Sequence, residues 1–166
     1  MRYAECPTTD VESYIDARPE RVWELVTDIR LIAEVSTELT RVEWQDEAGC
    51  AAVGARFVGH NFHQAMGEWQ TTSFVIECER PRVFAWAVSD VANPSSIWRF
   101  TLRPDGTGTV LTQWAQMGPG RSGLNYAIDA MPDKEERIVA RRLSEFRTGM
   151  TANLARIKEL SEAPVA

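Results

Sequence analysis

The chain has 166 residues, 44% of them hydrophobic and 25% charged, the proportions of a globular domain with a sizeable core. Its 24 acidic residues outnumber its 18 basic ones, and the formal charge of -6 argues against nucleic acid or an anionic membrane as main partner. Since no apolar run approaches the ~20 residues that span a bilayer and the first residues lack an apolar signal core, we expect a cytoplasmic protein with no integral membrane segment.

The N-terminal third is expected to contain one strand and two short helices. Residues 1–9 show no pattern and are expected to be a loose end. The alternation from Val11 to Ala17 predicts a strand, which residues 18–20 end because Pro19 suits the first turn of a helix. Two short helices follow in the prediction, the first around Val22 and Trp23 and the second over residues 28–35.

From Thr40 onward the apolar period changes to two, which predicts strands. The connections contain turn-forming residues such as Arg80-Pro81 and are short enough for antiparallel hairpins. Six strands are expected, over residues 39–46, 54–63, 68–79, 82–89, 95–103 and 108–117. The register of the last one stays open, because Trp114 and Met117 fall on opposite faces.

A long amphipathic helix ends the chain. Pro132 ends the preceding segment, and Asp133 and Glu136 have the spacing of a capping box. The helix would be roughly 40 Å long. Its apolar positions recur at steps of three and four: Val139, Leu143, Phe146, Met150, Leu154 and Ile157. The order of elements predicts one α+β domain over residues 10–162, with helices on one face of an antiparallel sheet.

Several predicted strands carry an aromatic face, for example Phe84 and Trp86 on one strand and Trp98 and Phe100 on another. Such a face is either ordinary core or, with a few polar groups among the aromatics, the wall of a small-molecule pocket. We predict a pocket between sheet and helix. The candidate lining residues are Phe57, Asn61, Trp69, Ser73, Trp86, Trp98, Phe100, Trp114, Met117, Tyr126, Met131, Val139, Leu143, Phe146 and Met150.

Residues 118–123, with the sequence GPGRSG, match the letters of a dinucleotide-binding loop. The match fails on context, because the neighbouring strands are antiparallel hairpins and Pro119 removes a backbone donor. We interpret the segment as a loop at the end of the sheet. Tyr126 and Met131 after it would close the pocket or pack at the foot of the helix.

Metal ions and cofactors are not expected. Cys6, Cys50 and Cys78 are odd in number and widely separated, which suggests neither a disulfide framework nor a zinc site. His60 and His63 would point to opposite faces of one strand, so they would not share a metal ion. Either histidine could act as a general base. Their roles stay open, and no catalytic residue is assigned.

Residues 15–28, with the sequence IDARPERVWELVTD, resemble the opening strand and helix of the START-like superfamily. This superfamily, also called SRPBCC, includes lipid-transfer domains, pollen-allergen-like carriers and polyketide cyclases/dehydrases. Residues 53–57, the Arg80-Pro81 turn before residues 84–86, and residues 98–100 before 106–109 are similar too. The resemblance covers residues 10–160 and implies a helix-grip fold, in which a curved antiparallel sheet of about seven strands wraps around the C-terminal helix. In that superfamily, chains of this length and layout are often bacterial proteins of unassigned activity.

Three functions are compatible with these observations. The resemblance implies binding or transport of a hydrophobic or aromatic small molecule, such as a lipid or polyketide, and we favour this one. A cyclase/aromatase-dehydratase would need a charged or histidine side chain in the cavity, from His60, His63, Glu68 or Arg82. A protein-interaction module, as in chaperone-activating relatives, would need an exposed apolar patch. The sequence indicates neither the ligand nor the oligomeric state.

Overall fold

The computed structural model describes residues 1–45 and 51–164, so Cys50, the last residue of the strand predicted over 39–46 and part of the connection to the strand predicted over 54–63 lie outside the described residues. The strands are β1 (Thr8–Ile15), β2 (Leu39–Trp44), β3 (Arg56–His63), β4 (Gly67–Glu79), β5 (Val83–Val88), β6 (Ser96–Asp105) and β7 (Gly108–Met117). The helices are α1 (Pro19–Val26), α2 (Ile29–Val35), α3 (Leu124–Ala130) and α4 (Glu135–Glu162), with short 3-10 turns at Tyr3–Glu5 and Pro132–Lys134.

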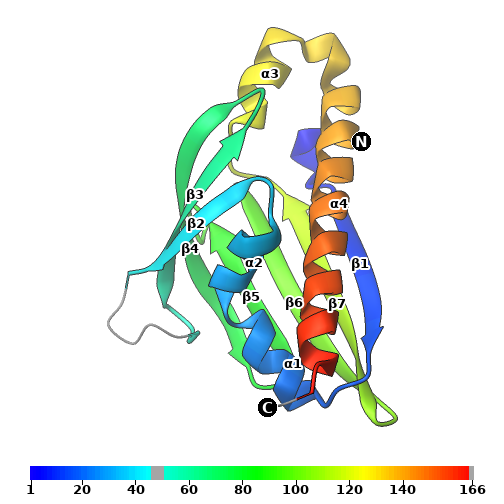
Figure 1. Ribbon diagram of the computed structural model, residues 1–166. Coiled ribbons are helices and arrows are strands. Elements are labelled where there is room, and N and C mark those ends of the chain that lie inside the picture. The colour runs from blue at the N-terminus through cyan, green and yellow to red at the C-terminus, as the bar shows by residue number, and fades with distance from the viewer. Residues whose placement is uncertain (46–50, 165–166) are drawn as a thin grey trace.

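The seven strands form one antiparallel sheet in the order β1-β7-β6-β5-β4-β3-β2. Figure 1 shows α4 running along one face of this sheet, with α1 and α2 near its C-terminal end and α3 near its N-terminal end. The register shifts between Val75 and Glu77 in β4 and between Leu39 and Arg41 in β2, and such bulges increase twist and bend a sheet. The predicted α+β fold with seven strands, two short helices and a long C-terminal helix is confirmed.

The buried side chains form two clusters along α4. The larger one packs Leu154 and Ile157 of α4 against Trp23 of α1 and the aromatic rings of β5 and β6. The smaller one joins Val139 and Leu143 to side chains near the start of the chain and on α3. The two ends of α4 are thus fixed by solid core, and the space for a site lies beside its middle.

The structure differs from the expected loose end at residues 1–9. The Tyr3 ring is buried in the smaller cluster, and its hydroxyl donates a hydrogen bond of 2.6 Å to the carbonyl oxygen of Gly120. Burial raises the pKa of Tyr3, although a hydrogen bond with Ser122 works in the opposite direction. β1 also begins at Thr8, earlier than the alternation predicts. One buried aromatic ring therefore holds the N-terminal segment in place.

The start of α4 also differs from the prediction. Pro132, Asp133 and Lys134 form a 3-10 turn, and α4 itself begins at Glu135. Its N-cap residue is Lys134, which makes no side-chain capping bond, so the predicted capping box is wrong. Glu135 instead accepts a hydrogen bond from the backbone N–H of Tyr3, which ties the first turn of α4 to the N-terminal segment.

Candidate functional site

A cavity of about 840 Å³ lies between the inner face of the sheet and the middle of α4. Its lining comes from α2, the segment between α2 and β2, the strands β3 to β7, and α4. The volume is within the range of small-molecule sites, which is ~300–1,000 Å³. The bent sheet and a single covering helix leave this space, because one helix cannot cover the whole concave face.

Aromatic rings form one wall of the cavity. Trp86 and Trp98 are direct cross-strand partners on β5 and β6. Phe57 stands 5.8 Å from Trp86, and Phe146 of α4 stands 4.8 Å from Trp98, both between ring centroids. The indole N–H of Trp98 donates to the Ser96 hydroxyl at 3.0 Å, so its polar group is already satisfied. This wall therefore offers a ligand a largely apolar surface.

The structure brings eight of the predicted site residues together around the cavity: Phe57, Asn61, Trp69, Ser73, Trp86, Trp98, Phe146 and Met150. The other seven lie elsewhere. Phe100 belongs to the main core, and Met117, Val139 and Leu143 belong to the smaller cluster. Tyr126 is 79% exposed and Met131 38% exposed, and neither lines the cavity.

Trp114 lies on the convex face of β7, not in the cavity. The Arg99 guanidinium stands 4.8 Å above its ring, and Arg99 also donates to Glu77 at 2.8 Å. Because side chains alternate along a strand, Gln113 points inward in its place. The prediction of Trp114 as a lining residue is therefore wrong. It followed from the aromatic character of the side chain, which suits a pocket wall better than a glutamine does.

A pair of amide side chains forms the inner end of the cavity lining. Gln113 of β7 is 1% exposed and Asn153 of α4 is 7% exposed. The Asn153 nitrogen donates to the Gln113 side-chain oxygen at 3.3 Å. The Asn153 side-chain oxygen is buried and has no hydrogen-bond partner among the residues that the structure describes.

An ionic cluster lies at the other end of the cavity and ties α4 to the sheet. Arg142, 11% exposed, donates to both carboxylate oxygens of Glu38, at 2.8 and 2.5 Å, and to Glu145 at 2.9 Å. The same Glu145 oxygen, Oε2, lies 3.4 Å from the Nε2 atom of His63 at the end of β3, and the other oxygen, Oε1, accepts from Arg141 at 3.3 Å. This cluster (Glu38, His63, Arg142 and Glu145) closes the gap between α4 and the start of β2.

The charges in this cluster stabilise one another. Burial would lower the pKa of Arg142, but the hydrogen bonds and charges of Glu38 and Glu145 raise it above its usual value. Burial would likewise raise the pKa of Glu145, but Arg142, with smaller contributions from His63 and Arg141, holds it below its usual value. Both shifts favour the charged forms of Arg142 and Glu145, so this ion pair is maintained at neutral pH.

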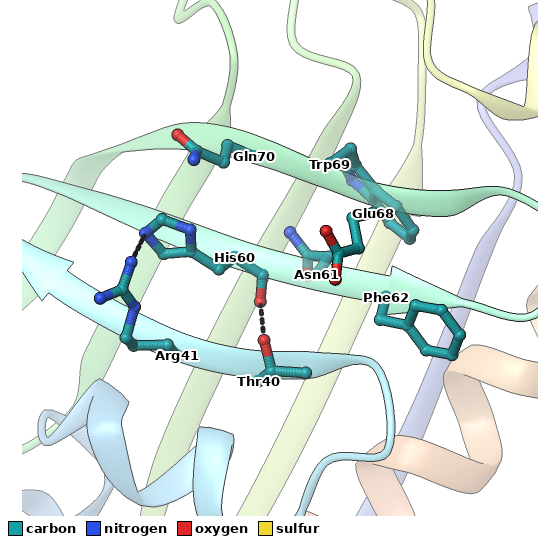
Figure 2. A pocket seen from close by; sticks show the side chains of 8 residues that line it. All are labelled: Thr40, Arg41, His60, Asn61, Phe62, Glu68, Trp69 and Gln70. Atoms are coloured by element: carbon teal, nitrogen blue, oxygen red, sulfur yellow. Dashed lines mark hydrogen bonds between the residues drawn. The ribbon is translucent and has the colours of Figure 1, made fainter.

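His60 lies outside the cavity, in a shallow groove of about 530 Å³ on the other face of β2, β3 and β4. Figure 2 shows Arg41, His60 and Gln70 in a row across the three strands, with the Arg41 guanidinium in contact with the His60 ring. The Arg41 Nη2 and His60 Nε2 atoms are 3.0 Å apart. Glu68 lines the same groove, and Arg82 is exposed beside Glu79. Of the four candidates for acid–base chemistry, only His63 lines the cavity.

Two glycines of the loop over residues 118–123 are required by the backbone, one by close packing and one by its conformation. A Cβ at Gly120 would stand 2.1 Å from the carbonyl oxygen of Asn93, and Gly118 has a φ of +73°. The Tyr3 ring lies directly against this loop. In the described residues, moreover, no three His, Cys, Asp or Glu side chains gather as a metal site, and no helix is long and apolar enough to cross a membrane.

Sequence reasoning missed Arg142, Glu145, Gly149 and Asn153, all of which line the cavity. A signal for most of them was present. Arg142 precedes Phe146 by four positions, and Asn153 follows Met150 by three, so the helical step that selects the apolar stripe also selects these polar neighbours. A stripe selected by hydrophobicity alone leaves these positions out.

The sequence family described as "Polyketide cyclase / dehydrase and lipid transport" matches residues 7–162. The polyketide-cyclase-like protein Cgl2372 of Corynebacterium glutamicum is 31% identical, covers 92% of this chain and 90% of its own, and has a TM-score of 0.64. No curated protein sequence matches the chain.

Two larger proteins share the fold. The di-domain ARO/CYC protein BexL from the BE-7585A biosynthetic pathway is 13% identical, with a TM-score of 0.71 over 96% of this chain and 51% of its own. The di-domain ARO/CYC protein StfQ from the steffimycin biosynthetic pathway is 12% identical, with a TM-score of 0.70 over 93% of this chain and 50% of its own. This chain therefore spans about half of each, and at this identity the likeness is one of fold.

Proposed function

Because this chain belongs to the polyketide cyclase/dehydrase and lipid-transport family, we propose that it binds a hydrophobic or aromatic small molecule in the cavity beside α4, within one ligand-binding domain over residues 10–162. The observation that carries the proposal is the cavity of about 840 Å³ walled by Phe57, Trp86 and Trp98. A ligand that buries about 300 Å² of apolar surface there would gain roughly 7 kcal/mol before the costs of association.

The test is a titration with N-phenyl-1-naphthylamine, a neutral probe whose fluorescence rises in apolar surroundings. We expect saturable binding with one probe per chain, together with quenching of tryptophan emission, because Trp86 and Trp98 line the cavity. Native mass spectrometry of protein purified from its own organism would then identify what occupies the site. The proposal is wrong if the probe does not saturate and no small molecule accompanies the protein.

A second candidate function, cyclase/dehydratase catalysis, is favoured by one observation, the position of His63 at the cavity. The His63 Nδ1 atom accepts a hydrogen bond from the backbone N–H of Ala65 at 3.0 Å, so the neutral ring carries its proton on Nε2, facing Glu145. Such a ring has no free lone pair for a general base, and this supports binding over catalysis. A His63→Gln variant separates the two: catalysis would be lost in it, whereas binding would persist.

A further inference from the structure

A buried side-chain oxygen at the inner end of the cavity lining has no hydrogen-bond partner among the described residues, which lowers the stability of the fold. Asn153 is 7% exposed, yet its side-chain oxygen has no partner among the described residues, and Gln113 beside it is 1% exposed. An unsatisfied buried polar atom destabilises a fold, because it has lost its hydrogen bonds to water and gained none in return. Two leucines would fill a similar volume without this penalty, so the fold alone does not require the amide pair.

Charge is distributed unevenly along the cavity. Its charged lining residues are Glu38, His63, Arg141, Arg142 and Glu145, and the Arg142 guanidinium is already occupied by two carboxylates. Asn153 lies three helical turns, about 16 Å, further along α4 than Arg142. Neither Gln113 nor Asn153 carries a charge, and a carboxylate beside the unpaired Asn153 oxygen would be repelled by it.

From these observations we infer that the ligand carries a neutral hydroxyl group at the end that lies deepest in the cavity. This hydroxyl binds the Asn153–Gln113 pair. The inference rests on the proposed function and names its ligand class: a hydroxylated aromatic or alicyclic compound with an apolar body. A hydroxyl group both donates and accepts, so it can satisfy the Asn153 oxygen while accepting from a neighbouring amide. The apolar body then lies against the rings of Trp86, Trp98 and Phe146.

The test compares three probes of one shape: 2-naphthol, 2-methylnaphthalene and 2-naphthoate, each measured by displacement of N-phenyl-1-naphthylamine. The quantity of interest is the ratio of the Kd values for 2-methylnaphthalene and 2-naphthol. Between wild type and Asn153→Leu this ratio should fall by about tenfold, which corresponds to one satisfied buried polar group. Comparing ratios cancels the different hydration of the two probes. We expect 2-naphthoate to bind more weakly than 2-naphthol.

Two further variants keep the test decisive. Gln116→Leu is the matched control, because Gln116 is also an amide on β7 but faces the other side of the sheet; its ratio should equal that of wild type. The double variant with Gln113→Leu and Asn153→Leu removes both amides, so its melting temperature should equal or exceed that of wild type while the preference for 2-naphthol is lost.

The outcomes distinguish this inference from the proposed function. If wild type and Asn153→Leu have the same ratio, or if 2-naphthoate binds as tightly as 2-naphthol, the hydroxyl inference is overturned and ligand binding stands. If neither N-phenyl-1-naphthylamine nor any of the three probes binds wild type, ligand binding itself is overturned and the inference with it.

Discussion

Gly149 offers the sharpest separation of helix stability from ligand binding. It lies in the interior of α4 and lines the cavity, and a Cβ built on it would have no heavy atom within 4 Å. Glycine in a helix interior is about 1 kcal/mol less favourable than alanine. Gly149→Ala should therefore raise the free energy of unfolding by about 1 kcal/mol and the melting temperature by roughly 2–4 °C in a chain of this size.

Gly149→Phe places a large ring at the same position in the cavity lining. Phenylalanine retains part of the helix gain, so this variant should be at least as stable as wild type. Its ring would occupy space that a ligand needs, and we expect the Kd for N-phenyl-1-naphthylamine to rise by about tenfold or more, a loss of ~1.4 kcal/mol. Gly149→Ala is the matched control, since a methyl group removes little of the 840 Å³.

Urea denaturation followed by circular dichroism measures the stability of both variants, and the probe titration measures binding. A loss of stability in Gly149→Ala would contradict the open surroundings of this position. An unchanged Kd in a well-folded Gly149→Phe would place the binding site elsewhere and refute the reasoning.

Three further predictions concern charge and the placement of aromatic side chains. Arg142→Met should lower the free energy of unfolding by about 1.5–3 kcal/mol in urea denaturation, because two carboxylates lose their hydrogen bonds, whereas Arg137→Met on the exposed side of α4 should stay within ~0.5 kcal/mol of wild type. The folded state lowers the pKa of Glu145, so its stabilising contribution is present above the ordinary value of 4.5 and is lost as the pH falls below it. In Glu145→Gln the free energy of unfolding should therefore fall less steeply than in wild type as the pH is lowered through this range. An unchanged slope would contradict this. Trp98→Leu should weaken probe binding, while Trp114→Phe on the convex face should leave the Kd unchanged. If Trp114→Phe weakened binding and Trp98→Leu did not, the probe would bind on the convex face and not in the cavity.

The faces of the central strands could be predicted from the sequence because one set of alternate residues is clearly more apolar. On β5 and β6, Phe84 pairs with Phe100 and Trp86 with Trp98, all on the inner face. β7 lacks such a contrast. Its inner residues include Gln113 and its outer ones include Trp114, and the choice depends on Asn153, a partner 40 positions away. Alternation alone carries no information about such a partner.

The helix could be predicted, but its contacts could not. The apolar stripe of α4 is uniform in sequence from Val139 to Ile157, yet its first part packs on Tyr3 and Ile128 and its last part on the main core. Only Phe146 and Met150 between them line the cavity. Periodicity identifies a buried side of a helix, whereas what covers each turn depends on segments far away in the sequence.

The position of β1 has a consequence for how the protein is made. Strands β2 to β7 each pair with their neighbour in sequence, so they can form as local hairpins while the chain is being synthesised. β1 must wait for β7, since Thr8 lies opposite Gln116, and α4 follows later still. In a nascent chain the sheet therefore lacks its covering helix until α4 has been synthesised, and the cavity beside α4 can bind a ligand only after that step.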